Sequence, residues 1–356
     1  MAMVDRAVGG ASVTGDRSPK ARRLTWFLLV VLCTAALAGL ATGSAGTSLW
    51  RALSDLFRGH ELSLRDRVVL MDIRAPRVIM GCIVGAGLAV SGAVLQGLFR
   101  NPLADPGIVG VSAGASLGAA SAIVLGGTFS FAVGFAIWLV PMAAFAGAWF
   151  TTILLYRVAT RRGRTSVATM LLAGIALTAL AMALTGILVY MADDTQLRDF
   201  TFWSMGSLAG SSWSKVSIAG PLIVLPLLFS PLLAHGLNAL SLGEAAAGHI
   251  GIRVQRLKAC AVLVVAAATG ASVAVSGGIG FVGIVVPHLL RLVSGPDHRY
   301  LLINSALLGA ALLVLADMLS RVIISPSELP IGIVTAVIGA PFFLWILLRQ
   351  RGIVDF

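Results

Sequence analysis

The chain has 356 residues, of which 58% are hydrophobic and only 12% are charged, and its mean hydropathy is +0.96. Soluble domains carry about 25% charged residues, so this composition nearly excludes a water-soluble fold. The net charge of +11 is spread over the stretches between apolar runs, which argues against a nucleic-acid binder with one basic face.

Apolar runs long enough to cross a bilayer as a helix, about 20 residues, recur along the whole sequence. The alternating strands of a transmembrane barrel are missing from it. We therefore predict an all-α membrane protein with ten transmembrane helices. The predicted spans are 24–43, 76–99, 106–126, 131–156, 166–192, 214–234, 256–276, 279–294, 301–320 and 330–348.

The polar segments set the predicted orientation. Residues 1–23 are expected to form a disordered cytoplasmic tail, 24–350 a single membrane domain, and 351–356 a short cytoplasmic tail. A signal peptide has an apolar core of about 7–15 residues, so the longer run 24–43 favours a retained first helix over a cleaved signal. Most Lys and Arg residues then lie inside, as the positive-inside rule requires.

Two connecting segments are longer than the others. Residues 44–75, predicted to lie outside, mix apolar and charged positions as an interfacial helix does. Residues 235–255 are predicted to form the longest inside segment.

A short motif occurs twice. "GAGLAVSG" (85–92) returns as "GASVAVSG" (270–277), with six of eight positions identical. The copies fall in the second and seventh predicted helices, which run in opposite directions. This predicts an inverted repeat of helices 2–5 and 7–10, as transporters often have, although a chance match in a Gly- and Ala-rich chain remains an alternative.

The stretch "SGGIGFVGIVVPHLL" (276–290) is expected to interrupt a helix. Its four glycines and Pro287 weaken helical structure through backbone entropy and a missing N–H. A broken helix at membrane depth is tolerated only where protein or a water-filled cavity covers it. We therefore predict a pathway or gate element here.

The usual motifs for nucleotide binding and for metal chemistry are missing from the sequence. None of the three lysines follows a glycine, so there is no Walker A motif. No HExxH or Cys/His metal pattern occurs, so we predict neither an enzyme nor a metal site. Asp317 and Arg321 are four residues apart, which predicts a structural ion pair on one helix face.

Five blocks of sequence, taken together, resemble the permease family for iron–siderophore complexes, haem and vitamin B12, the transmembrane subunits of type II ABC importers. The resemblance covers about residues 25–350. The blocks are "RAPR" (74–77), "GAGLAVSGAVLQGLFRNPLADPGIVGVSAGAS" (85–116), "LGEAAAGHIGI" (242–252), "SGGIGFVGIVVPHLLRLVSGPDHR" (276–299) and "ELPIGIVTAVIGAPFFLWIL" (328–347).

The resemblance implies a permease that pairs as a homodimer in the bacterial inner membrane, with both termini in the cytoplasm. Two separate ATPase subunits would use ATP and Mg²⁺, while this chain would bind no cofactor. A periplasmic or lipid-anchored binding protein would deliver substrate from outside. "FTFWSMGSLAGSSW" (200–213) is more similar to haem permeases than to the vitamin B12 branch. Haem is therefore favoured and a ferric siderophore is next; vitamin B12 and a stand-alone secondary transporter are the alternatives.

The resemblance also implies three sets of functional residues. Docking of the binding protein falls on Arg74, Arg77 and Arg321, for which lipid headgroup contact or helix capping is the alternative. The cytoplasmic gate falls on Asn101, Leu103, Ser166 and Thr169, of which the first two also fit an ordinary tight turn. Coupling to the ATPase falls on Leu242, Gly243, Glu244, Ala245, Ala246, Gly248 and Gly251.

Overall fold

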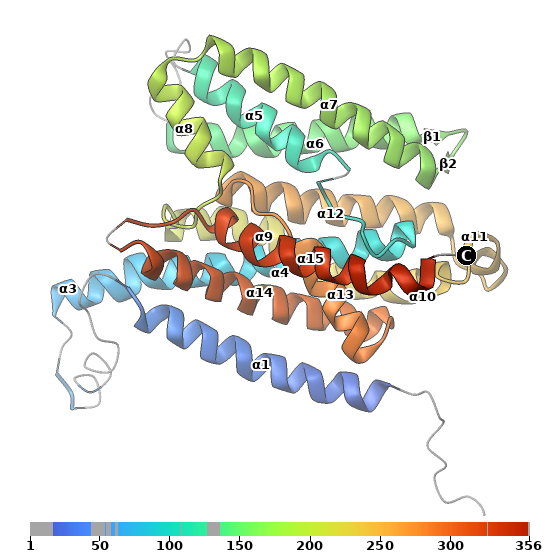
Figure 1. Ribbon diagram of the computed structural model, residues 1–356, viewed down its shortest axis with the longest axis horizontal. Coiled ribbons are helices and arrows are strands. Elements are labelled where there is room, and N and C mark those ends of the chain that lie inside the picture. The colour runs from blue at the N-terminus through green and yellow to red at the C-terminus, as the bar shows by residue number, and fades with distance from the viewer. Residues whose placement is uncertain are drawn as a thin grey trace, which may run out of the picture.

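A computed structural model describes residues 17–43, 54, 58–60, 63–107, 109–126, 136–325 and 327–354 (Figure 1). Ten apolar helices form the body of this part of the chain. They are α1 (Ser18–Ala41), α4 (Ala75–Phe99), α5 (Val111–Leu125), α6 (Ala136–Ala159), α7 (Val167–Met191), α9 (Trp213–Phe229), α12 (Val254–Ser276), α13 (Val282–Ser294), α14 (His298–Ile323) and α15 (Ile331–Val354).

Shorter elements connect these helices. They are α3 (Leu64–Arg67), a π-helical turn (Val68–Arg74), the hairpin β1 (Thr160–Arg161) and β2 (Arg164–Thr165), α8 (Asp194–Ser204), a 3-10 turn (Ser230–Leu233), α10 (Ala234–Leu240) and α11 (Glu244–His249).

The ten predicted spans are confirmed within the described residues. Seven helices are long and apolar enough to cross a membrane, and the remaining three, α5, α13 and the apolar part of α15, are shorter apolar helices. The first and last helices are longer than their predicted spans, because α1 begins at Ser18 and α15 continues to Val354. Pro19 in the first turn of α1 favours a helix start there. Residues 1–16 of the predicted tail lie outside the described residues.

The predicted interfacial segment 44–75 is described only in part. Residues 64–74 do not form a separate surface helix; they continue through the π-helical turn into α4 as one helical stretch, Leu64–Phe99. Most of 44–62 lies outside the described part of the chain, so the prediction of an interfacial helix there stays open.

α4 is the central helix of the bundle. In the apolar 18-residue stretch of the helical segment that contains α4, 83% of the stretch is buried. The buried share of the corresponding stretch is 17% in α1 and 17% in α7. Small residues bring its backbone against its neighbours: a side chain on Gly85 would overlap the carbonyl of Gly309 in α14, and one on Gly92 would overlap that of Gly283 in α13. Such close approach is how helices pack where lipid gives no hydrophobic driving force between them.

The two motif copies lie side by side in antiparallel helices. The copy in α4 faces the copy in α12, since a side chain on Gly87 would contact the hydroxyl of Ser272. The third and eighth apolar helices, α5 and α13, are both short, with 15 and 13 residues. Each follows a residue in the left-handed region, Gly110 (φ 82°) and Phe281 (φ 68°). This correspondence fits the predicted inverted repeat.

The predicted helix interruption is present after Ser276. α12 ends there, Gly277 takes φ 70°, and α13 begins only at Val282. Protein covers the break: Ser207 N donates to the carbonyl of Ser276 (2.8 Å), and a side chain on Gly277 would overlap the carbonyl of Trp203. The start of the interrupted backbone is therefore buried within the bundle, as expected at membrane depth, whereas Gly280 is exposed.

Candidate functional site

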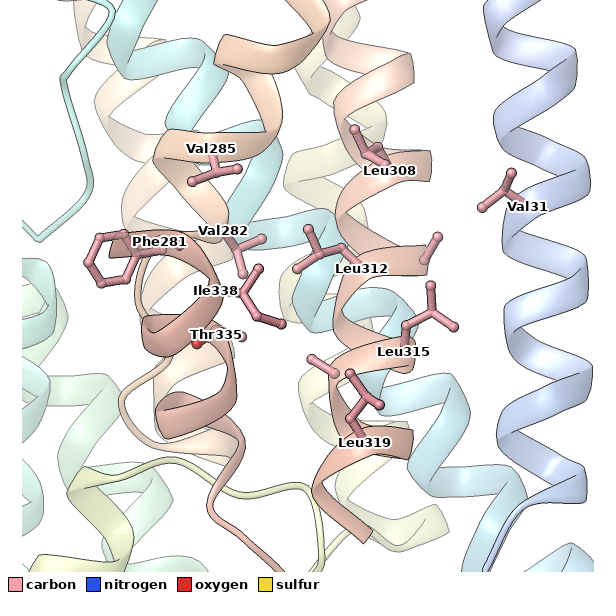
Figure 2. A pocket seen from close by; sticks show the side chains of 13 residues that line it. Val31, Phe281, Val282, Val285, Leu308, Leu312, Leu315, Leu319, Thr335 and Ile338 are labelled. Atoms are coloured by element: carbon pink, nitrogen blue, oxygen red, sulfur yellow. The ribbon is translucent and has the colours of Figure 1, made fainter. Parts of the chain in front are cut away.

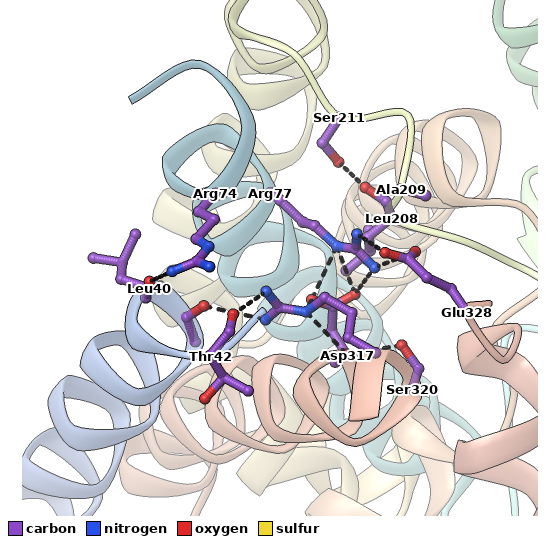
Figure 3. A network of polar contacts seen from close by, with 12 residues as sticks. Leu40, Thr42, Arg74, Arg77, Leu208, Ala209, Ser211, Asp317, Ser320 and Glu328 are labelled. Atoms are coloured by element: carbon purple, nitrogen blue, oxygen red, sulfur yellow. Dashed lines mark hydrogen bonds and ion pairs between the residues drawn. The ribbon is translucent and has the colours of Figure 1, made fainter. Parts of the chain in front are cut away.

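The three arginines predicted to meet a binding protein lie close together. Arg77 and Arg321 both pair with Asp317, and Arg74 and Arg321 both contact the end of α1. Figure 3 shows Arg74, Arg77 and Asp317 in this cluster. All three arginines are buried, with 3%, 6% and 7% of Arg74, Arg77 and Arg321 exposed. Arg77 binds Asp317 through Nε (3.0 Å) and Glu328 through both terminal nitrogens (2.8 and 2.9 Å). The predicted pair of Asp317 and Arg321 is confirmed, at 3.2 Å.

Arg74 and Arg321 cap the C-terminal end of α1. Arg321 donates to the carbonyls of Thr42 (2.8 Å) and Gly39 (3.2 Å), and Arg74 donates to that of Leu40 (2.8 Å). The last carbonyls of a helix have no partner within it and carry partial negative charge. Capping, the alternative interpretation of these residues, therefore describes their observed contacts, and docking by them stays a prediction.

The stretch "RNPLADP" forms a tight turn between α4 and α5, as its composition predicts. Arg100 ends α4 in the left-handed region (φ 51°). Asn101 Oδ1 accepts from the backbone N–H of Leu103 (2.9 Å), and Asp105 Oδ1 accepts from that of Gly107 (2.7 Å). Burial raises the pKa of Asp105, and the Gly107 hydrogen bond only partly opposes it.

The second pair of predicted gate residues stands at the start of α7. Ser166 is the N-cap of the helix, and its hydroxyl accepts from the backbone N–H of Thr169 at 3.3 Å. Both side chains are exposed. The described side-chain hydrogen bonds of Asn101 and Ser166 are each made within their own segment. The gate that Asn101, Leu103, Ser166 and Thr169 would form stays a prediction.

The predicted coupling region projects from the end of the bundle that also holds the β1–β2 hairpin and the last turns of α15 (Figure 1). The Ala-rich run forms α11 between two glycines with positive φ, Gly243 (106°) and Gly251 (89°). Leu242 is 73% exposed and Ile250 58%. A side chain on Gly248 or Gly251 would meet open space, so this face is uncovered in the single chain.

An apolar cleft of about 330 Å³ opens between α1, α13, α14 and α15 (Figure 2). Of the described residues that line it, Thr335 alone has a polar side chain, and Phe281, Leu312 and Ile338 are among the others. A surface of this kind suits an acyl chain or another apolar helix better than a ligand with charged groups.

The comparisons with known proteins agree with this geometry. The model of the FecCD transport family matches residues 28–349. The chain belongs to the FecCD transport family.

Curated relatives of this permease are similar over most of their length. The hemin transport system permease protein of Yersinia pestis is 42% identical over 93% of this chain and 96% of its own. The cobalamin import system permease protein of Halobacterium salinarum is 46% identical over 80% of this chain and 74% of its own. A solved inward-facing structure of a metal-chelate type ABC transporter is 32% identical, covers 92% of this chain and 99% of that one, and has a TM-score of 0.81.

Sequence reasoning missed a structural role for Gln96. Pro287 lies inside α13, so the carbonyl of Gly283 loses its usual partner in the helix. Gln96 Nε2 donates to that carbonyl at 3.2 Å, and Gln96 Oε1 accepts from Arg291. The permease thus repairs the proline break in α13 with a side chain of α4. A buried glutamine next to a proline-containing helix is a weak signal, and nothing local in the sequence links the two.

Substituting Gln96 by leucine is expected to destabilise the permease by about 1–3 kcal/mol, because it leaves the buried Gly283 carbonyl unpaired. Thermal unfolding in detergent measures the loss. The double variant Gln96→Leu/Pro287→Ala restores a backbone N–H to α13 and should recover part of it. A double variant no more stable than Gln96→Leu would contradict this assignment.

Acid should weaken the start of α14. Burial alone would raise the pKa of Asp297, but hydrogen bonds from Arg299 and Asn238 outweigh it and lower this pKa to about 2. Because the folded pKa lies below the unfolded value of about 3.9, the stability it contributes is complete above that value and is lost as pH falls towards 2. The difference in melting temperature between wild type and Asp297→Ala should therefore shrink from pH 5 to pH 2; a constant difference would contradict the prediction.

Proposed function

We propose that this permease works as a homodimer within an ATP-driven importer of the bacterial inner membrane and moves a large metal chelate. Haem is the favoured chelate, a ferric siderophore is next, and vitamin B12 is the alternative within the same family. Both termini face the cytoplasm. The relatives named for hemin and cobalamin support this substrate class, since both compounds are metal ions held in large organic rings.

The exposed apolar face around α11 carries the proposal. Leu242 and Ile250 lie outside the apolar spans, where no lipid tail would cover them. Exposed apolar side chains on a compact projecting element favour burial against another protein. The sequence contains no Walker A motif of its own, so an ATPase subunit is the partner that fits. A stand-alone secondary transporter would need no such surface.

The other end of the bundle receives the binding protein in this proposal. Arg77 is held by Asp317 and Glu328, and Glu328 is the more accessible of these acids, with 38% of its side chain exposed against 3%. A carboxylate of a docking protein would take the place of Glu328 on the Arg77 fork, which suits bidentate carboxylate binding. Movement of the gate residues would then release substrate on the inside.

Uptake into proteoliposomes containing the whole complex tests the proposal. Haemin, a ferric siderophore and cobalamin are offered separately, with and without ATP inside the vesicles. ATP-dependent uptake of haemin is expected. Uptake of only another chelate would overturn the substrate assignment, and accumulation by the lone chain without an ATPase would overturn the importer architecture.

Substitution of Leu242 by serine is expected to weaken ATPase binding about tenfold, because removing a large apolar contact costs on the order of 1.5 kcal/mol. Affinity is measured by titrating the ATPase onto the permease in nanodiscs. Leu64→Ser is the matched control, because Leu64 is 80% exposed at the opposite end of the bundle. Equal effects of the two substitutions would remove the coupling role from Leu242.

A further inference from the structure

Lys258 is a buried cation that the functions described above do not use. It lies in the second turn of α12 and is only 1% exposed. Among the described residues it is the largest fully buried side chain. An unpaired ammonium group is very costly to bury. Two acceptors compensate for this one: Nζ donates to Glu244 Oε1 at 2.8 Å and to the carbonyl of Thr165 at 2.6 Å.

Both backbone polar groups of Thr165 are hydrogen-bonded to side chains of α12. Its carbonyl accepts from Lys258, and its N–H donates to Gln255 Oε1 at 2.8 Å. Gln255 and Lys258 are three residues apart, so they share one face of the helix. Thr165 also pairs with Thr160 across the hairpin, with their hydroxyls 2.8 Å apart. The chain enters α7 at the next residue, Ser166.

Glu244 ties the same lysine to α11. It is the first residue of that helix, and 42% of its side chain is exposed, whereas Lys258 is enclosed. α11 and the hairpin lie at the same end of the bundle (Figure 1). The ammonium group of Lys258 therefore connects the projecting α11 with the start of α7. It reaches α7 through Thr165, which is 93 residues from Lys258 in the sequence.

We propose that Lys258 is a positioning residue that passes a displacement of α11 to the start of α7. This inference rests on the proposed coupling role of α11. If a partner moves Glu244, the lysine either follows it or is left as a buried charge with one neutral acceptor. Breaking a buried ion pair by removing one partner is strongly unfavourable, so the three groups move together. The Thr165 carbonyl then carries Ser166 and Thr169 with it.

The test is Lys258→Met in the reconstituted complex, which keeps a similar unbranched apolar stem but removes the ammonium group and with it the link. ATP hydrolysis and chelate uptake are measured in the same vesicles. ATP hydrolysis should continue, while uptake per ATP should fall about tenfold, within the 5–150-fold range of typical coupling between sites. Lys258→Arg, which keeps the positive charge, should restore part of the uptake per ATP. Lys215→Met is the control, because Lys215 is a lysine of another apolar helix, α9.

A second readout separates positioning from mere stability. A spin label at Thr169 should shift on ATP binding in wild type, and the shift should disappear in Lys258→Met. If the variant melts earlier but keeps both the shift and uptake per ATP, Lys258 is structural only and the inference is wrong. If the wild-type complex shows no ATP-driven uptake, the proposed function fails instead.

Discussion

Substitution of Asp317 by asparagine is expected to destabilise the permease by about 3–5 kcal/mol, the usual effect of breaking a buried ion pair. Asp317 is 2% exposed and accepts from both Arg77 and Arg321. Asparagine has nearly the same shape but no charge. Among the described contacts of the two guanidinium groups, Glu328 would then be the remaining charged partner. It hydrogen-bonds Arg77 but not Arg321.

Thermal unfolding of the purified permease in detergent measures this effect. Glu328→Gln is the matched control, because Glu328 binds the same Arg77 but has 38% of its side chain exposed. A solvent-exposed ion pair contributes about 0–1 kcal/mol, so the control should lose much less stability than Asp317→Asn. Equal losses would show that burial of Asp317 does not set the strength of this cluster.

Substitution of Gly92 by alanine is expected to have the second large effect. The new methyl group would overlap backbone atoms of Gly283 in α13, and backbone cannot rotate away as a flexible side chain can. Overpacking of this kind costs typically about 1–3 kcal/mol and sometimes more. Because α4 is the central helix, its displacement from α13 would also disturb the segment that follows the break after Ser276.

Gly186→Ala provides the comparison, because Gly186 lies in α7 with open space around the added carbon. Alanine is a better helix former than glycine by up to about 1 kcal/mol, so this variant should melt at the same temperature as wild type or slightly higher. If Gly92→Ala also melts like wild type, the close packing of α4 against α13 is wrong.

The arginine cluster changes how docking experiments should be designed. Charge reversal at Arg77 would remove a docking contact and also break the pairs with Asp317 and Glu328. Reversal at Arg74 would remove a cap from α1. A loss of docking in either variant therefore has to be compared with its melting temperature. Glu328→Gln is a cleaner probe, since it weakens the hold on Arg77 while leaving Asp317 in place.

The sequence by itself determined the features that depend on neighbouring residues. The lengths of the apolar runs predicted ten spans, and the asparagine, aspartate and prolines of "RNPLADP" predicted a turn. The glycines after Ser276 predicted the break, because backbone entropy acts locally. The helix ends were less well predicted, as at Ser18 and Val354, because capping and packing also decide where a helix stops.

Only the tertiary structure decided which polar groups meet. Arg77 and Asp317 are 240 residues apart, Gln96 and Gly283 are 187 apart, and Lys258 and Thr165 are 93 apart. Each contact satisfies a charge or a carbonyl that the bilayer and the bundle hide from water. The demand for a partner can be read from one residue, but the partner is chosen by how the helices pack, and nothing in the local sequence carries that choice.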